Sequence, residues 1–259
     1  MNASPNLQLA LALDEAEHAP QRRTFIKRVS ASLVALGGLA LAGGQPAAQS
    51  RPASPARSTT AVGRQPEDAD NFYQSRGVTA RKVRFKNQYE MDVAGSLFVP
   101  NNLNRSSAHA AIVVGHPMGA VKEQSANLYA TKMAEQGFVT LSIDLPYWGE
   151  SEGRPRNVVA PDLYAEAFSA AVDFLGTQRF VDRERIGVLG ICGSGSFVIS
   201  AAKIDPRMKA IATLSMYDMG AANRNALNHS QTLAQRKQII AEAAEQRYAE
   251  FTGGETRYT

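Results

Sequence analysis

One stretch of the sequence, 185–200, combines residue types that could carry out covalent catalysis with the spacing that would present them. A short apolar run, 186–191, predicts a buried strand, the glycine-rich segment 190–195 predicts a sharp turn, and helix-compatible sequence follows. A strand, a tight turn of small residues and a helix form the setting of a nucleophile elbow, and Cys192 holds the nucleophile position. The alternative interpretation is a buried structural cysteine. We favour the elbow because its whole context is present.

The same turn predicts a site that stabilises negative charge. Gly193 follows Cys192 at the start of the predicted helix, where backbone N–H groups have no partner within the helix and the helix dipole favours an anion. A thiol beside such a donor suits attack on a carbonyl carbon, with the N–H group holding the resulting oxyanion. The predicted chemistry is therefore acyl transfer.

The elements that would position Cys192 alternate between strands and helices. Apolar strands are predicted at 110–115, 138–143, 186–191 and 210–216, and helices at 122–136 and 161–175. Short buried strands separated by helices predict a doubly wound, mostly parallel sheet covered on both faces. Before them, the alternating segments 81–86 and 92–99 predict an antiparallel hairpin at a sheet edge. The fold class is therefore α/β.

Composition sets the outer bounds. The chain has 259 residues, of which 44% are hydrophobic, enough for one large α/β domain. Its formal net charge of +4 is spread along the chain, without a Lys/Arg block outside the N-terminus, so we expect no nucleic-acid partner. A single cysteine excludes an intramolecular disulfide and a zinc cluster of thiolates. The sequence indicates no cofactor and no metal site.

The N-terminal region indicates export. Gln-Arg-Arg-Thr-Phe-Ile-Lys at 21–27 resembles a twin-arginine signal, and the apolar segment 29–42 is shorter than the ~20 residues that a membrane-spanning helix needs. We interpret 1–48 as a signal peptide and the segment 49–77, rich in Pro, Ala, Ser and Arg, as a flexible linker. The twin-arginine export machinery is thus a predicted partner, a permanent membrane span is not expected, and the mature protein is predicted to be periplasmic or secreted.

From Val78 onward the chain resembles the α/β-hydrolase superfamily, in particular its dienelactone-hydrolase-like and X-Pro-peptidase-like bacterial members. Three motifs carry the resemblance in the expected order. Gly-His-Pro-Met-Gly at 115–119 is similar to the oxyanion loop of the family, and Asp-Leu-Pro-Tyr-Trp-Gly-Glu-Ser at 144–151 is similar to its Asp-x-x-Gly-x-Gly-x-Ser loop. The third is the elbow around Cys192, where dienelactone hydrolases also use cysteine.

The resemblance suggests a second oxyanion donor. Pro117 has no N–H group, so the backbone N–H of Met118 should pair with that of Gly193. Cys192 would attack the carbonyl carbon between these two donors.

It also suggests roles for the loop residues. His116 ends a strand at the position where the family uses a histidine to hold the oxyanion loop, and we group it with Tyr147 and Trp148 as the substrate-binding region. Asp144 is expected to cap a turn.

The end of the sequence departs from the family pattern, in which an acid and then a histidine follow the nucleophile. Asp218 is a candidate acid and His229 a candidate base, although a polar loop histidine is the favoured interpretation of His229. After residue 216 we recognise only one long amphipathic helix, N-capped by Ser230. We therefore interpret 78–259 as an incomplete domain that lacks the last strands, with the acid and histidine supplied beyond it.

The leading functional hypothesis is an exported hydrolase of small-molecule esters, thioesters or lactones. An inactive remnant or binding module of the same fold is the alternative, and a peptidase is a further one. If the strand at 210–216 has no outer neighbour, its unpaired edge would favour self-association.

Overall fold

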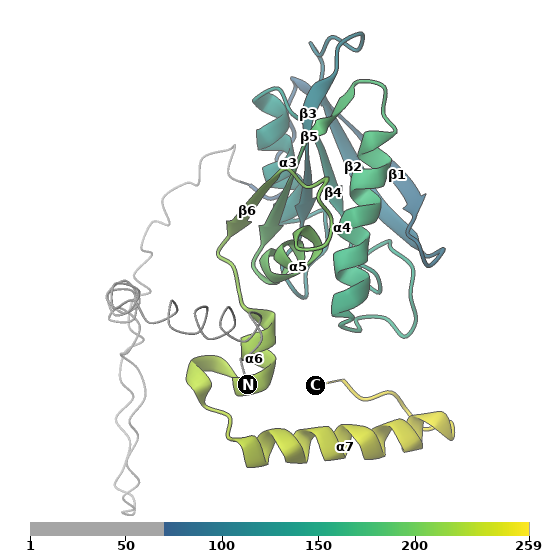
Figure 1. Cartoon of the computed structure of the whole chain (residues 1–259). Coiled ribbons are helices and arrows are strands. Elements are labelled where there is room, and N and C mark those ends of the chain that lie inside the picture. Colours follow the sequence, from purple (N-terminus) through teal and green to yellow (C-terminus); the bar gives the residue numbers. More distant parts are fainter. Residues whose placement is uncertain (1–69, 259) are drawn as a thin grey trace, which may run out of the picture. The chain divides into compact units, whose positions relative to one another are not determined.

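A computed structural model of the chain describes residues 70–258 (Figure 1). The predicted signal peptide, 1–48, and most of the predicted linker, 49–77, lie outside the described residues. The first strand begins at Val78, where the sequence predicts that the domain starts.

The described residues form one six-stranded sheet in the order β1-β2-β4-β3-β5-β6 (Figure 1). The strands are β1 (Val78–Lys86), β2 (Asp92–Pro100), β3 (His109–Gly115), β4 (Val139–Ile143), β5 (Val181–Ile191) and β6 (Ala210–Leu214). β1 and β2 form an antiparallel hairpin, and β2 continues antiparallel to β4. The other pairs, β4-β3, β3-β5 and β5-β6, are parallel. The predicted edge hairpin and mostly parallel sheet are confirmed.

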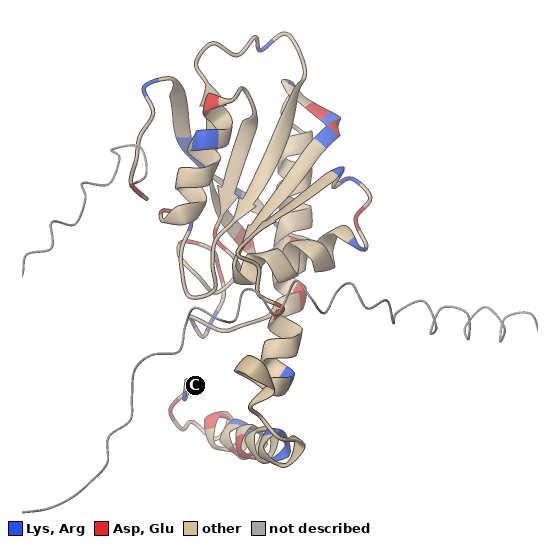
Figure 2. Ribbon diagram, turned by 90° about the vertical axis from the view of Figure 1, so that its left-hand side faces the viewer, with Lys and Arg blue, Asp and Glu red and all other residues tan. Residues whose placement is uncertain are grey.

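Helices cover both faces of this sheet. α3 (Ser125–Glu135) packs on one face through small side chains, Ala126, Ala130 and Ala134. α4 (Pro161–Gly176) and α5 (Gly193–Ala202) pack on the other, where the rings of Tyr164 and Phe197 meet edge to face. β3 and β4 carry no Lys, Arg, Asp or Glu, as expected for strands buried between two helical layers, and the charged residues of β5 lie at its start, 182–185 (Figure 2).

Two predicted helix starts are wrong. α3 begins at Ser125 rather than at Lys122, because Lys122 lies in the preceding loop with its side chain turned into the protein. The long C-terminal helix, α7 (Leu233–Phe251), is capped by Thr232 and not by Ser230. Thr232 and Gln235 form a reciprocal capping box that satisfies two backbone N–H groups, an arrangement that Ser230 does not have.

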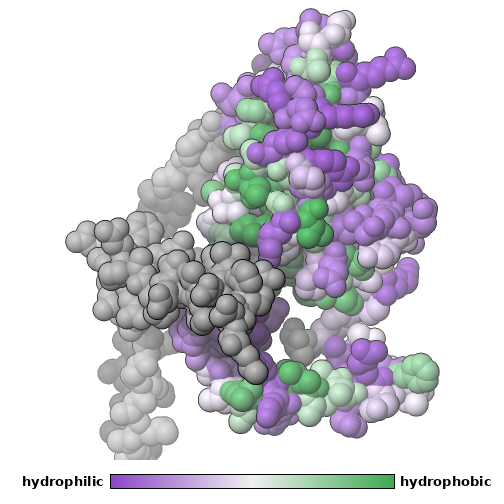
Figure 3. All heavy atoms as spheres, in the orientation of Figure 1, coloured by the Kyte–Doolittle hydropathy of each residue, from purple (hydrophilic) through white to green (hydrophobic). Residues whose placement is uncertain are grey.

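The prediction that the strand at 210–216 is buried is also wrong. Within the described residues β6 pairs only with β5 and is largely exposed; Ile211 keeps 50% of its surface accessible. α7 has no buried residue, and apolar atoms are visible along it (Figure 3). The predicted exposed sheet edge is therefore present in residues 70–258, whereas self-association through it stays a prediction. No helix in that range is both long and apolar enough to cross a membrane.

The sheet centre should dominate stability. Leu141 in β4 is fully buried, so we expect Leu141→Ala to lower the free energy of unfolding by about 3 kcal/mol, through lost burial and the cavity left behind. The matched control is Leu233→Ala at the exposed start of α7, which should change it by less than about 0.5 kcal/mol. Urea unfolding of the three proteins measures both values, and equal losses would contradict this account of the core.

Candidate active site

Cys192 lies between the end of β5 and the start of α5. Its backbone has φ 53° and ψ −117°, a conformation that a residue with a side chain rarely adopts. The N–H of Cys192 donates to the carbonyl of Leu214 at the end of β6 (2.9 Å), and its own carbonyl accepts from the N–H of Gly195 (3.0 Å). This is the strained turn that an elbow requires, and the half-buried thiol stands at its tip.

Close approaches explain why the residues around Cys192 are small. A β-carbon on Gly190 would lie 2.5 Å from the carbonyl oxygen of Ser194, so any larger residue would push strand and helix apart. Ser194 itself is fully buried, and its hydroxyl donates to the carbonyl of His116 in the loop after β3. The turn is thus packed against the loop that the sequence predicts to complete the oxyanion site.

The two predicted oxyanion donors are brought together. A β-carbon on Gly193 would lie 3.4 Å from the backbone nitrogen of Met118 and 3.1 Å from its β-carbon. The main chains of the two residues are therefore neighbours, one at the first turn of α5 and the other in the β3–α3 loop. This placement suits two N–H groups that share one oxyanion, although the catalytic roles of Cys192, Met118 and Gly193 stay predictions.

His116 holds the loop through both ring nitrogens. Nε2 accepts from the N–H of Leu145 (3.1 Å), so Nδ1 carries the proton and donates to the carbonyl of Pro117 (2.7 Å). Burial lowers the pKa of His116, although the hydrogen bond to Pro117 opposes this, and the ring stays neutral. With 1% of its surface exposed, His116 could meet a substrate only after the loop moved, which argues against its predicted substrate contact.

Trp148 and Tyr147 stabilise the loop after β4. The indole N–H of Trp148 is shared between the hydroxyl of Tyr164 (2.6 Å) and the carbonyl of Val158 (3.2 Å). Tyr147 has φ 71°, and its ring lies where a side chain on Gly153 would stand. Both residues fix the shape of this loop, and their contact with a substrate stays a prediction.

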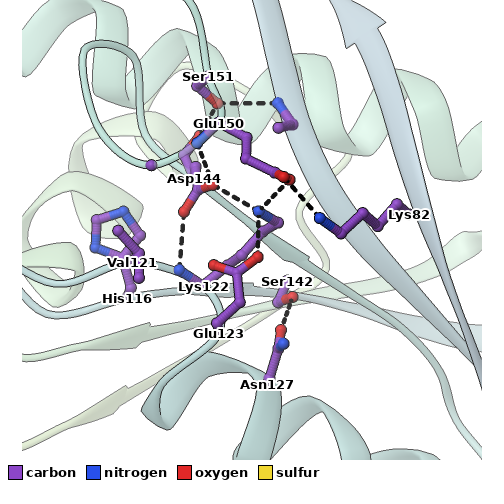
Figure 4. Close-up of polar contacts among 12 residues, drawn as sticks. Lys82, His116, Val121, Lys122, Glu123, Asn127, Ser142, Asp144, Glu150 and Ser151 are labelled. Carbon is purple, nitrogen blue, oxygen red and sulfur yellow. Dashed lines mark hydrogen bonds and ion pairs between the residues drawn. The ribbon is translucent and has the colours of Figure 1, made fainter.

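Asp144 anchors the same loop and confirms its predicted turn-capping role. Its Oδ2 accepts from the N–H of Glu150 (2.9 Å), and it also binds the ammonium group of Lys122 (2.7 Å) (Figure 4). Carboxylate oxygens of Glu123, Asp144 and Glu150 lie within 4.8 Å of one another, close enough to hold a cation. The ammonium group of Lys122 already contacts all three, at 2.6–3.0 Å. Sequence reasoning missed this lysine.

The other two predicted triad members have local roles. The Oδ1 of Asp218 accepts from the N–H of Ala221 (2.8 Å) and caps α6 (Met219–Asn225). His229 ends the short 3-10 turn η2 (Leu227–His229) with an exposed side chain. Among residues 70–258 no hydrogen bond joins Cys192 to either of them. Their catalytic roles stay predictions.

Comparisons with known proteins bear on the family and the fold. The model of a family described as PET hydrolase-like (PETase) matches residues 59–249. The uncharacterized protein PA2218 of Pseudomonas aeruginosa is 47% identical over 187 residues, which make up 72% of this chain and 50% of that protein. Its crystal structure matches with a TM-score of 0.69 at 46% identity, covering 72% of this chain and 58% of the other.

Two further matches carry informative names. Thiohydrolase aneE of Aspergillus aculeatus is 38% identical over 104 residues, 40% of this chain and 33% of that protein. The crystal structure of the α/β hydrolase GrgF from Penicillium sp. sh18 is 22% identical with a TM-score of 0.59, covering 70% of this chain and 58% of the other. The fold is thus that of the α/β hydrolases. The chain spans half the length of PA2218 and a third of the length of aneE.

The neutral state of His116 predicts a pH dependence of stability. Because its pKa is lowered on folding, only the unfolded chain takes up this proton as the pH falls below about 6.5, the ordinary pKa of histidine. Stability that is present above this pH is therefore lost toward the folded-state pKa, by up to about 1.4 kcal/mol per pH unit.

The variant His116→Gln keeps an acceptor for Leu145 but does not titrate, so its free energy of unfolding should fall less than that of the wild type between pH 7 and pH 5. Urea unfolding at several pH values measures the two slopes. His229→Gln, at an exposed position, is the control and should follow the wild type. Parallel curves for His116→Gln and the wild type would contradict the assignment.

Proposed function

The chain belongs to the PET hydrolase-like family of α/β hydrolases, and we propose that it cleaves small-molecule ester, thioester or lactone bonds with Cys192 as the nucleophile. The observation that carries this proposal is the placement of Cys192 on a strained strand-to-helix turn with the main chains of Met118 and Gly193 side by side next to it. The name of the thiohydrolase relative supports thioesters as one member of the substrate class.

The proposed reaction has two halves. The sulfur of Cys192 bonds to the substrate carbonyl carbon, and the resulting oxyanion accepts hydrogen bonds from the N–H groups of Met118 and Gly193. The carbon–oxygen or carbon–sulfur bond to the leaving group then breaks, the leaving group takes up the proton that the thiol released, and an acyl thioester remains on Cys192. Water hydrolyses this thioester and regenerates the thiol. We propose that a histidine and a carboxylate complete the triad, from residues that the described part of the chain does not bring to Cys192.

The first half-reaction can be tested in a single turnover, because the acyl group stays on Cys192 until water hydrolyses the thioester. With p-nitrophenyl acetate, we expect the protein to gain the mass of one acetyl group and to release p-nitrophenol at least about 100-fold faster than Cys192→Ala does. Intact-mass spectrometry and peptide mapping locate the acetyl group, and absorbance follows the release. Equal rates in both proteins, or an acetyl group confined to lysine residues, would contradict the proposal.

We also propose that the protein is exported by the twin-arginine route to the periplasm or the cell exterior; the paired arginines at 22–23 support this. In a bacterial host with that route, replacing both by lysine, Arg22→Lys with Arg23→Lys, should retain the protein in the cytoplasmic fraction at full length. The net charge is unchanged, so the variant is its own control for charge. Immunoblots of the cell fractions decide, and an identical distribution of the two proteins would contradict export by this route.

A further inference from the structure

Lys122 carries a fully buried charge outside the residues assigned to the reaction. Its side chain has 0% of its surface exposed, and its ammonium group contacts Glu123 (2.6 Å), Asp144 (2.7 Å) and Glu150 (3.0 Å) (Figure 4). Burial works against this charge, but the hydrogen bonds and ion pairs with the three carboxylates outweigh it and raise the pKa of Lys122. All three N–H donors of the ammonium group thus have an anionic partner.

These contacts join the loop that carries Met118 to the loop after β4. Lys122 lies in the loop after β3, whereas Asp144 and Glu150 belong to the loop after β4. The backbone N–H of Lys122 also donates to Oδ1 of Asp144 (2.8 Å), so this aspartate binds the lysine through both of its oxygens. The β4 loop wraps closely around the aspartate; a β-carbon on Gly149 would stand 2.2 Å from its Oδ2.

A second contact to the loop after β4 comes from His116, at the beginning of the loop that carries Lys122. His116 binds the N–H of Leu145, immediately after Asp144. The segment 117–121 is therefore fixed to the β4 loop on both sides, by His116 before it and by Lys122 after it. Met118 lies between these two contacts, with its backbone nitrogen next to Gly193.

A buried ion network of this kind gives weak grounds for a role in stability. Removing two charges from water offsets much of their attraction, and well-packed apolar residues often stabilise a protein as well or better. What the network does provide is a fixed geometry. Three directed hydrogen bonds from a buried ammonium group fix the relative position of two loops.

We propose that Lys122 is a positioning residue that holds the oxyanion loop so that the N–H of Met118 faces the same point as the N–H of Gly193. This rests on the proposed function, because the position of Met118 matters only if an oxyanion forms there. Lys122 itself does not touch the substrate. Lys82 also binds Glu150 (2.6 Å), but its side chain is 71% exposed, so this ion pair is expected to add little to the position of the loop.

The experiment compares two reactions of Cys192 that differ in their need for an oxyanion site. Acetylation by p-nitrophenyl acetate forms an oxyanion, whereas alkylation by iodoacetamide displaces iodide from a saturated carbon and forms none. We expect Lys122→Met to slow acetylation about 100-fold, the usual effect of losing one oxyanion donor. Alkylation should stay within about twofold of the wild-type rate, since the thiol and its turn are unchanged.

The matched control is Lys82→Met, which removes an exposed ammonium group from the same glutamate. We expect it to leave both rates within about twofold of wild type, because exposed ion pairs contribute little. An equal fall in both rates for Lys122→Met would indicate a general structural role and overturn the proposal, as would an unchanged acetylation rate. Failure of the proposed function is distinguishable from both, because the wild type itself would then not be acetylated at Cys192.

Lys122→Met removes the cation that pairs with the buried carboxylate of Asp144 and can impair folding. In a second, triple variant, Lys122→Met with Asp144→Asn and Glu150→Gln, only Glu123 of the three carboxylates keeps its charge, and because its side chain is 40% exposed, circular dichroism should show a folded protein. The same split between slow acetylation and normal alkylation is expected. A folded triple variant that is acetylated at the wild-type rate would overturn the proposal.

Discussion

The backbone strain at Cys192 is the constraint on which the site depends. A residue with a side chain in this conformation is disfavoured by about 1–3 kcal/mol, so the surrounding structure must hold it there. Three neighbours do so: the end of β6 accepts the N–H of Cys192, the first turn of α5 donates to its carbonyl, and the glycine-rich packing against Gly190 leaves no space for relaxation. The thiol is therefore presented by the fold as a whole and not by a mobile loop.

The loops after β3 and β4 are connected to each other mainly by polar contacts. Leu145, Met118 and Trp148 pack against the core. Directed polar bonds then pin the two loops to each other: His116 to Leu145, and Lys122 to Asp144. Polar bonds fix angles as well as distances, whereas apolar packing tolerates small rotations. An oxyanion site, which requires a backbone N–H to point in one direction, benefits from the first kind of support.

The sequence was most informative where the signal is local. The small residues around Cys192 and the apolar runs that became β3, β4 and β5 are contiguous, so pattern and geometry coincide. Lys122 was missed because a lysine is expected in water, and the carboxylates that allow its burial lie 22 and 28 residues further along the chain. The sequence does contain the signal for the cap of α7, because Gln235 stands three residues after Thr232, the spacing of a capping box. The exposure of β6 could not be predicted from its residues, because the burial of a strand depends on its neighbours and not on its own composition.

The edge strand β6 is in direct contact with the proposed nucleophile. β6, whose Leu214 carbonyl accepts the N–H of Cys192, is one of the two edge strands among the described residues, and with 5 residues it is shorter than β1 with 9. Local opening of a sheet starts at such strands. If the end of β6 opens, Leu214 no longer accepts the N–H of Cys192 and the strained turn loses one of its supports. A further strand paired with the outer edge of β6 would therefore hold Cys192 more firmly without contacting it.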